Sequence, residues 1–225
     1  MKIIKRILIA IAILILGAIG FLVSEIILIS KPTHGKPIAH YEQPQKALLV
    51  IDVQEDFTGT TAKPPFPYPE SEQLIETVNR ITEAAYRENI PIIYIRQEMD
   101  GFPGEMLSNL IAGGIAIKGN PGTQIDKRVS VISDHIFPKH RSDAFSNPKF
   151  EAFLIKNQVN ELILIGLDAD GCVHATARGA LNRGYTVSVV TDAVALMAKD
   201  KWEKLLKQYQ EEGIRLIKSD GLITD

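Results

Sequence analysis

Asp52, Lys139 and Cys172 each come shortly after a short run of apolar residues. If these runs are parallel strands of one sheet, their carboxyl ends meet at one edge and the three side chains converge there. Cys172 also opens a predicted helix, where the helix dipole favours the thiolate, and a neighbouring ammonium favours it further. A carboxylate can carry the thiol proton to a leaving group. Together, the three residue types predict nucleophilic catalysis by a thiol.

Each of the three residues also has an ordinary structural explanation. An Asp after a strand is often a turn residue, a Lys is usually solvated, and a single Cys is usually packed in the core. Other nucleophile schemes find no support, because His174 lies about 200° around a helix from Cys172 and cannot act as its base. The sequence also lacks a G-x-S-x-G elbow, a G-x-G-x-x-G motif and a P-loop lysine. The convergence of three groups is what distinguishes the candidate site.

The elements that would position these residues alternate along the chain. Six runs rich in Ile, Val and Leu are too short for helices and too uniformly apolar for one-sided strands, which is typical of parallel strands covered on both faces. Helical periodicity lies between them, and Gly184 and Gly213 stand where helix C-terminal caps belong. We expect strands at Ala47–Ile51, Pro91–Ile95, Val129–Ile136, Glu161–Ile165, Tyr185–Val190 and Ile214–Ile217, and helices at Glu70–Glu88, Asn147–Asn157, Cys172–Asn182 and Asp200–Glu212. This alternation predicts a doubly wound, mainly parallel six-stranded α/β sheet with helices on both faces, a Rossmann-like fold.

Two segments interrupt the alternation. Lys63–Pro69 is proline-rich, and we interpret it as a stiff loop beside a pocket rather than as a polyproline ligand. Gln97–Arg128 carries six glycines. Long glycine-bearing connections within a compact domain are more often functional than accidental, so we expect this segment to shape the substrate pocket.

Composition excludes several classes of protein. The 225 residues carry a net charge of −2 and no strongly basic stretch, so nucleic acid is not expected as a partner. The single cysteine excludes an internal disulfide and a cluster of thiolate metal ligands.

The first thirty residues differ from the rest of the chain. Ile7–Ile29 is apolar enough to cross a bilayer and follows three basic residues, so residues 1–30 are predicted to form an uncleaved transmembrane anchor. A cleaved signal peptide and a buried domain helix are the alternatives. Basic residues flank both ends, and their slight bias favours a single-pass protein with an extracytoplasmic domain. Residues 31–45 are predicted to form a linker and residues 46–225 the α/β domain.

Three motifs resemble those of the isochorismatase-like cysteine hydrolases, in the family's order and spacing, and the resemblance covers essentially Lys46 to Thr224. The motifs are Asp52–Phe57, Lys139–Phe145 and Gly166–Val173, with further similarity at Ala175–Ala180, Gly184–Tyr185 and Thr191–Ala193. The resemblance implies a hydrolase domain with a catalytic triad of Asp52, Lys139 and Cys172, in which Cys172 is the nucleophile. It also implies self-association, a cis peptide bond entering Asp168, and an oxyanion hole made by the backbone N–H groups of Asp168 and Cys172.

The sequence departs from the metal-dependent nicotinamidases of this family. Those enzymes place an Asp-x-His pair and a further His after the second strand, where this sequence has Arg96–Phe102 and no histidine. The five histidines show no metal-ligand spacing, so we expect no metal and no other cofactor. Asp168 and Ala169 also stand where the family more often has a small residue and Thr.

The sequence therefore predicts a membrane-anchored, metal-independent cysteine hydrolase that cleaves a small amide or related C–N bond, with Phe57 as a wall of the substrate pocket. The expected partners are a small-molecule substrate, the lipid bilayer through residues 7–29 and, by the resemblance, a second copy of the chain. Two alternatives stay open. One is vinyl ether hydrolysis of the isochorismatase type with Asp52 as the acid, and the other is a non-catalytic, membrane-tethered binding protein.

Overall fold

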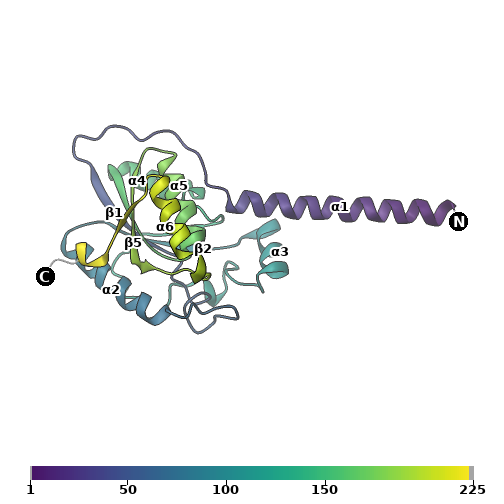
Figure 1. Cartoon of the computed structure of the whole chain (residues 1–225), viewed down its shortest axis with the longest axis horizontal. Helices are drawn as coiled ribbons and strands as arrows, with labels where there is room; N and C mark the ends of the chain where they lie inside the picture. The colour runs from purple at the N-terminus through teal and green to yellow at the C-terminus, as the bar shows by residue number, and fades with distance from the viewer. Residues whose placement is uncertain (1, 223–225) are drawn as a thin grey trace.

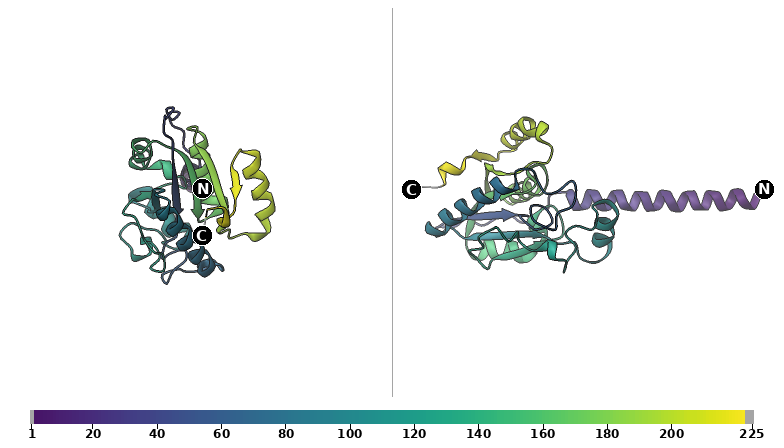
Figure 2. Two further views of the ribbon diagram at one scale, coloured as in Figure 1. Left: turned by 90° about the vertical axis from the view of Figure 1, so that its left-hand side faces the viewer. Right: turned by 90° about the horizontal axis from the view of Figure 1, so that it is seen from below.

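A long helix projects from an α/β body in the structure, a computed structural model that describes residues 2–222 (Figure 1). The helix is α1 (Lys2–Ser30), and the first and last described residues lie at opposite ends of the molecule (Figure 2, right). Residue 1 of the predicted anchor and residues 223–225 of the predicted domain lie outside the described residues.

The body is built on one sheet of six parallel strands in the order β3-β2-β1-β4-β5-β6. The strands are β1 (Gln45–Ile51), β2 (Ile92–Gln97), β3 (Ile136–Lys139), β4 (Val159–Gly166), β5 (Thr186–Val194) and β6 (Arg215–Ile217). Successive strands are added outward on one side of β1 and then, from β4, on the other. This arrangement confirms the predicted doubly wound α/β fold, and it makes the β1–β4 boundary the point where strand order reverses.

Helices cover both faces of the sheet and bury the strands between them. The helices of the body are α2 (Ser71–Arg87), α3 (Gly101–Ile111), α4 (Pro148–Lys156), α5 (His174–Leu181) and α6 (Trp202–Glu211). Along β1, Leu49 and Ile51 pack with residues of α4, α5 and α6, whereas Leu48 and Val50 pack with α2. Both faces of the strand are therefore apolar, which explains why its sequence does not alternate.

The predicted strand at Val129–Ile136 is wrong, because β3 begins only at Ile136 and ends at Lys139. The residues before it form a loop, and the backbone of Ser130 and Ile132 bonds to a side chain rather than to a neighbouring strand. The Tyr94 hydroxyl donates to Ser130 O at 3.2 Å and accepts from Ile132 N at the same distance. As a consequence, Lys139 is the last residue of β3 rather than a residue beyond it.

The connection between β2 and β3 contains a helix that the sequence did not indicate, α3, which lies beside the base of α1 in both Figure 1 and Figure 2. Its apolar side chains do not form one buried stripe: Leu107 is buried, whereas Phe102 and Leu110 are exposed. A helix without a single apolar face gives no clear periodicity in the sequence.

The N-terminal helix is long and apolar enough to cross a membrane, a property that it shares with signal sequences. Its residues Ile3–Ser30 have a mean hydropathy of 2.9. Most of its apolar side chains are exposed, so the α/β body does not bury it. A helix buried inside the domain, one of the three explanations of this segment, is therefore excluded.

Candidate active site

Asp52, Lys139 and Cys172 meet at the carboxyl edge of the sheet. Lys139 Nζ lies 2.8 Å from Asp52 Oδ2 and 3.1 Å from Cys172 Sγ. The ammonium therefore stands between the carboxylate and the thiol and contacts both. Asp52 follows β1, Cys172 follows β4, and Lys139 ends β3, so the cluster lies where ligands collect in doubly wound sheets.

Asp52 turns away from β1 in a conformation that few residues adopt. Its φ is +54°, in the left-handed region, so the chain bends sharply where the strand ends. Gly166 ends the neighbouring strand β4 with a φ of +111°. A Cβ at Gly166 would lie 2.1 Å from Ile51 O, so only glycine allows the two strand ends to approach this closely.

Lys139 is fully buried, and Gln97 holds it in place. Gln97 Oε1 accepts a hydrogen bond from Lys139 Nζ, and Gln97 Nε2 donates to Lys139 O at 3.2 Å. Gln54 fixes Gln97 in turn, since Gln54 Oε1 accepts from Gln97 N at 2.6 Å and Gln54 Nε2 donates to Gln97 O at 3.1 Å. Sequence reasoning missed both glutamines. Gln54 belongs to the first motif, which is the one signal that could have drawn attention to it.

Cys172 lies in a single π-helical turn, Ala169–Val173, that precedes α5. The Asp168 side chain fixes the start of this turn. It accepts hydrogen bonds from Tyr68 Oη at 2.8 Å, Asp170 N at 2.9 Å and Met197 N at 3.0 Å. Asp168, which departs from the family's usual residue, thus ties the cysteine-bearing turn to two other segments.

The cis peptide bond expected before Asp168 is absent from the structure. Among residues 2–222 the cis bonds are Pro64–Pro65, Phe66–Pro67 and Phe102–Pro103. A non-proline cis bond costs about 3–4 kcal/mol, and the turn that carries Cys172 makes its hydrogen bonds through Asp168 without one.

The charges of the site differ from the sequence expectation in one respect. Burial and, after it, the nearby Asp52 carboxylate raise the pKa of the Cys172 thiol to about 12, because together they outweigh the lowering effect of Lys139. Burial also raises the pKa of Asp52, although Lys139 opposes that effect. The pKa of Lys139 is raised, because attraction to Asp52 and Cys172 outweighs its burial. The resting thiol is therefore protonated, and the predicted stabilisation of the thiolate at a helix start does not prevail.

A cavity of about 290 Å³ opens onto Cys172. Most of its lining is apolar, and it includes Phe57, which the sequence analysis had placed at the pocket wall. The lining residues are Ile26, Ile29, Ser30, Phe57, Gln97, Met99, Leu107, Ser108, Ile111, Ala112, Ile115, Ala116, Ser142 and Cys172. Eight of these fourteen residues belong to the Gln97–Arg128 segment, as expected of a segment that shapes the pocket, and three belong to α1.

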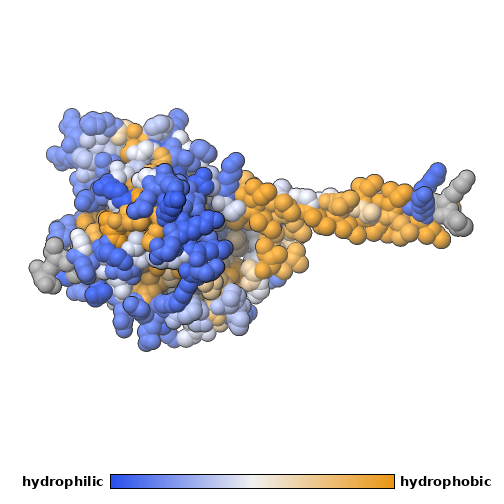
Figure 3. Space-filling view, viewed as in Figure 1, coloured by the Kyte–Doolittle hydropathy of each residue, from blue (hydrophilic) through white to orange (hydrophobic). Residues whose placement is uncertain are grey.

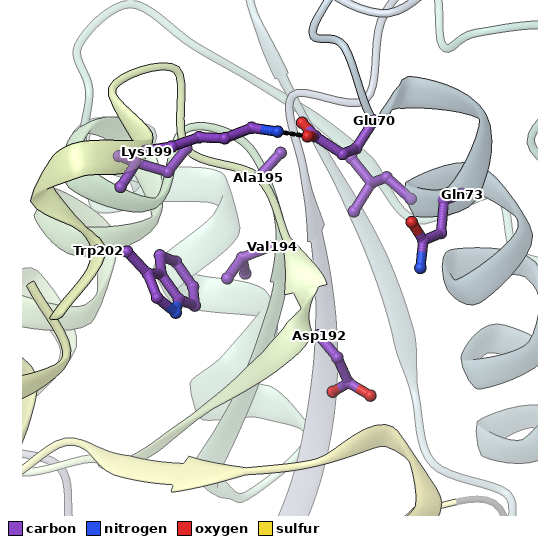
Figure 4. A pocket seen from close by; sticks show the side chains of 9 residues that line it. Glu70, Gln73, Asp192, Val194, Ala195, Lys199 and Trp202 are labelled. Carbon is purple, nitrogen blue, oxygen red and sulfur yellow. Dashed lines mark ion pairs between the residues drawn. The ribbon is translucent and has the colours of Figure 1, made fainter.

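Another cavity, of about 380 Å³, lies apart from this cluster (Figure 4). Glu70, at the start of α2, and Lys199 form an ion pair at its rim, and Asp192 and Trp202 line it from β5 and α6. Its lining contains none of the three clustered residues, so it is not the candidate active site.

The region after β2 does not fit a metal. Gln97, the last residue of β2, binds Lys139 with its side chain. The carboxylates of Glu98 and Asp100 are paired with Arg96 and Lys118. Met99 lies between them and offers a thioether, which suits neither zinc nor iron in the manner of His and carboxylate ligands. Within residues 2–222 no group of three or more His, Cys, Asp or Glu side chains is arranged to hold a metal ion.

The fold agrees with that of known proteins to which this chain is similar. The family model for the isochorismatase domain matches residues 46–220. N-carbamoylsarcosine amidase from Arthrobacter sp. is 31% identical over 147 residues, which cover 62% of this chain and 55% of that enzyme. Nicotinamidase 3 from Arabidopsis thaliana is 27% identical over 164 residues, covering 71% of this chain and 78% of that enzyme.

Solved structures show the same relationship. The crystal structure of N-carbamoylsarcosine amidase from Thermoplasma acidophilum has a TM-score of 0.66 and 28% identity, and covers 78% of this chain and 97% of that one. Pyrazinamidase from Pyrococcus horikoshii in complex with zinc has a TM-score of 0.65 and 26% identity, covering 78% of this chain and 99% of that one.

These similarities and the sheet topology define a doubly wound α/β protein whose candidate site lies at the carboxyl ends of the strands. The chain belongs to the isochorismatase family. The chain spans 55% of the length of the Arthrobacter amidase, and the reaction that it catalyses is treated below as a proposal.

Proposed function

We propose that this chain is a metal-independent cysteine hydrolase that cleaves an amide or related C–N bond through a triad of Asp52, Lys139 and Cys172. One observation carries the proposal: the buried Lys139 ammonium contacts both the Asp52 carboxylate and the Cys172 thiol. An amidase and a nicotinamidase among the relatives support C–N bond cleavage.

In the first half of the reaction, Cys172 Sγ attacks the carbonyl carbon of the substrate while its proton passes to Asp52. Asp52 Oδ1 is buried and has no hydrogen-bond partner, so it is free to receive that proton. The raised pKa of the thiol means that proton removal must accompany attack rather than precede it. Asp52 then gives the proton to the nitrogen as the C–N bond breaks, which leaves a thioester on Cys172.

In the second half, water attacks the thioester. Asp52 takes a proton from the water as the new C–O bond forms, and returns it to sulfur as the C–S bond breaks. The products are a carboxylic acid and the free thiol. Lys139 keeps Asp52 ionised between the two halves and stabilises negative charge on sulfur, because its ammonium stays in contact with both groups.

The backbone N–H groups of Asp168 and Cys172 are proposed to bind the oxyanion of each tetrahedral intermediate. The hydrogen bonds accepted by the Asp168 side chain support this role, because they hold the turn that carries both N–H groups rigid.

We also propose that α1 stays on the protein as a single-pass anchor, with residues 31–45 joining it to a domain of residues 46–225 on the extracytoplasmic side. The length and hydropathy of α1 support the anchor. The full-length chain should remain with membranes after carbonate extraction and keep its N-terminus, and added protease should reach the domain in intact cells. Recovery of the intact chain in the soluble fraction would contradict the anchor.

The test of the reaction uses the full-length chain in mild detergent and a panel of amides, carbamoyl compounds and isochorismate. Cys172→Ala and Asp52→Asn should each remove nearly all turnover of the best amide, while Asp134→Asn, which removes a carboxylate that is 96% exposed, should change little. Mass spectrometry of a quenched wild-type reaction should find acyl mass on Cys172.

Two other outcomes would replace the proposal. If Cys172→Ala kept most of its turnover of isochorismate while Asp52→Asn had none, ether hydrolysis with Asp52 as the acid would be the function. If neither substitution changed any measured rate, the non-catalytic binding protein would be the better description.

A further inference from the structure

The helix proposed as an anchor is part of the candidate pocket. Ile26, Ile29 and Ser30, at the end of α1, line the same cavity as Cys172. Ile111, at the end of α3, lines it as well. One wall of the pocket is therefore made by the helix that projects from the body.

Close contacts fix α1 in this position. Ser142 N donates to Ile29 O at 2.9 Å, and Ser142 also lines the pocket. Four residues further along, Thr33 donates to Asp143 Oδ2 through its N–H at 2.8 Å and its hydroxyl at 2.6 Å. Arg183 Nη1 donates to Thr33 Oγ1 at 3.0 Å. Because Asp143 and Arg183 are buried, these contacts make the end of α1 a constant part of the body.

An apolar surface continues from α1 onto α3. The exposed residues of α3 include Phe102, Leu110 and Ile111, which are 74%, 62% and 62% exposed. The rings of Phe21 and Phe102 are stacked, with their centroids 5.9 Å apart and an interplanar angle of 7°. Figure 3 shows the hydrophobic surface of α1 running without a break onto the part of the body where α3 lies.

The length of α1 brings this surface to the bilayer. Ile7–Ile29 spans about 34 Å as a helix, slightly more than the roughly 30 Å of a hydrocarbon core. Phe21 lies inside this apolar run, so lipid that surrounds the run also reaches Phe102 beside it. Apolar helical faces of this kind lie about 5–10 Å deep at the boundary between headgroups and acyl chains. The ion pair of Lys118 with Asp100, just before α3, suits the headgroup side of that boundary.

We propose that α3 enters the membrane surface beside α1 and that the pocket between them takes the acyl chain of a membrane-dissolved amphiphilic amide. The inference rests on the proposed function and names its substrate class. The amide carbonyl would lie at Cys172, and the chain would run along the apolar lining toward the lipid. The released fatty acid would return to the bilayer by the same path, and the amine would leave to water.

The first test uses the full-length chain in phosphatidylcholine vesicles with acetamide, octanamide and hexadecanamide, which present the same scissile bond. Expressed against the aqueous concentration of each amide, kcat/KM should rise by roughly three- to fourfold for each methylene that leaves water for the bilayer and the pocket. Leu110→Asp should lower the ratio of kcat/KM for hexadecanamide to that for acetamide at least tenfold, because it places a charge on the lipid-facing side of α3. Val131→Asp, which charges an exposed apolar residue before β3, should leave this ratio unchanged.

The second test does not depend on turnover. Cys172→Ala removes the only cysteine, so single cysteines can be spin-labelled in that background. A label at Leu110→Cys in vesicles should be accessible to oxygen and shielded from a water-soluble nickel chelate, and a label at Val131→Cys should show the reverse.

The outcomes separate the inference from the proposed function. Equal kcat/KM for the three amides would overturn the inference and leave amide hydrolysis in place. A label at Leu110→Cys that is open to the nickel chelate would also overturn it, whatever the activity. If no amide were hydrolysed while the label lay in lipid, the proposed reaction would fail and the substrate class with it.

Discussion

Lys139 Nζ lies 3.1 Å from Cys172 Sγ, yet the pKa of the thiol is raised to about 12. Burial and the Asp52 carboxylate outweigh the ammonium, because the positive charge of Lys139 is already paired with Asp52. The resting site therefore keeps a proton on sulfur.

The first prediction follows from this distribution of charge. With a pKa near 12, only about one thiol in ten thousand is ionised at pH 8, far fewer than for a free cysteine with a pKa of ~8.5. Alkylation of Cys172 by iodoacetamide should be slow and should rise about tenfold per pH unit from pH 7 to 10. Asp52→Asn should speed alkylation at pH 8, since it removes a negative charge that raises the thiol pKa. As the control, the wild type and Asp52→Asn should be alkylated at equal rates when both are unfolded in urea. An alkylation rate that reached a plateau above pH 9 in the folded wild type would contradict the prediction.

Gln97 should act as a positioning residue for Lys139. Gln97→Ala removes the acceptor of Lys139 Nζ and should lower kcat at least tenfold with little change in KM, because Lys139 then leaves the thiol. The pH profile of kcat should shift as well, since the ammonium loses a partner. Gln124→Ala, which removes an acceptor of Arg96 at an exposed contact, is the matched control. Loss of folding without any change in the kcat of the folded fraction would point to a structural role alone.

Activity should survive chelators. The residues after β2 do not fit a metal, so dialysis against EDTA or phenanthroline should change turnover by no more than about a tenth. Elemental analysis of the purified chain provides the check. A stoichiometric metal whose removal abolished turnover would show that the chain belongs with the metal-dependent members.

Stability should fall in acid, partly through Asp126. Burial opposes ionisation, but hydrogen bonds from Arg128 and Thr58 hold the pKa of Asp126 below its usual value. An Asp whose pKa is lowered by folding stabilises above its unfolded pKa of ~3.9 and loses this contribution as pH falls below it. Asp126→Asn should lower the melting temperature at pH 7, and between pH 5 and pH 2 the melting temperature of this variant should depend less steeply on pH. Asp134→Asn, at an exposed carboxylate, should leave that slope unchanged.

The Thr33–Asp143 contact should stabilise the junction between α1 and the body. Thr33→Val removes the hydroxyl that donates to the buried Asp143 carboxylate and accepts from Arg183, although the backbone N–H donors to this carboxylate remain. The loss should cost about 1–3 kcal/mol and lower the melting temperature by roughly 2–12 °C. Ser24→Ala removes a hydroxyl that bonds only within α1, and should have almost no effect. For the same reason, a chain that begins at Lys36 should be less stable than one that begins at Lys31.

The sheet could be predicted because most of its strands are buried on both faces. Ile163 and Leu164 of β4 are both almost inaccessible to solvent, and strands of this kind are recognised in the sequence as uniform apolar runs. The strand β3 could not be located in this way. It is a four-residue edge strand that contains Pro138, and the apolar residues near it belong to a loop.

The three residues at the strand ends could be predicted, but their surroundings could not. Gln97 gives no signal on its own, because an amide becomes informative only beside the ammonium that it binds. The contact of Thr33 with Asp143 joins residues 110 positions apart, which no local pattern reveals. The high pKa of the thiol depends on burial and on its distances from two opposite charges, and the sequence gives neither.

The attachment of α1 has a mechanical consequence. Ser142 and Asp143, which hold Ile29 and Thr33, follow Lys139 by only three and four residues. The end of α1 is therefore attached to the chain only a few residues from the Lys139 ammonium. If α1 spans a membrane as proposed, a bilayer that is thicker or thinner than its apolar run places a load on the helix, and Ser142 and Asp143 carry that load toward Lys139. Turnover measured in vesicles of graded acyl length would then vary with the thickness of the membrane as well as with the concentration of the substrate.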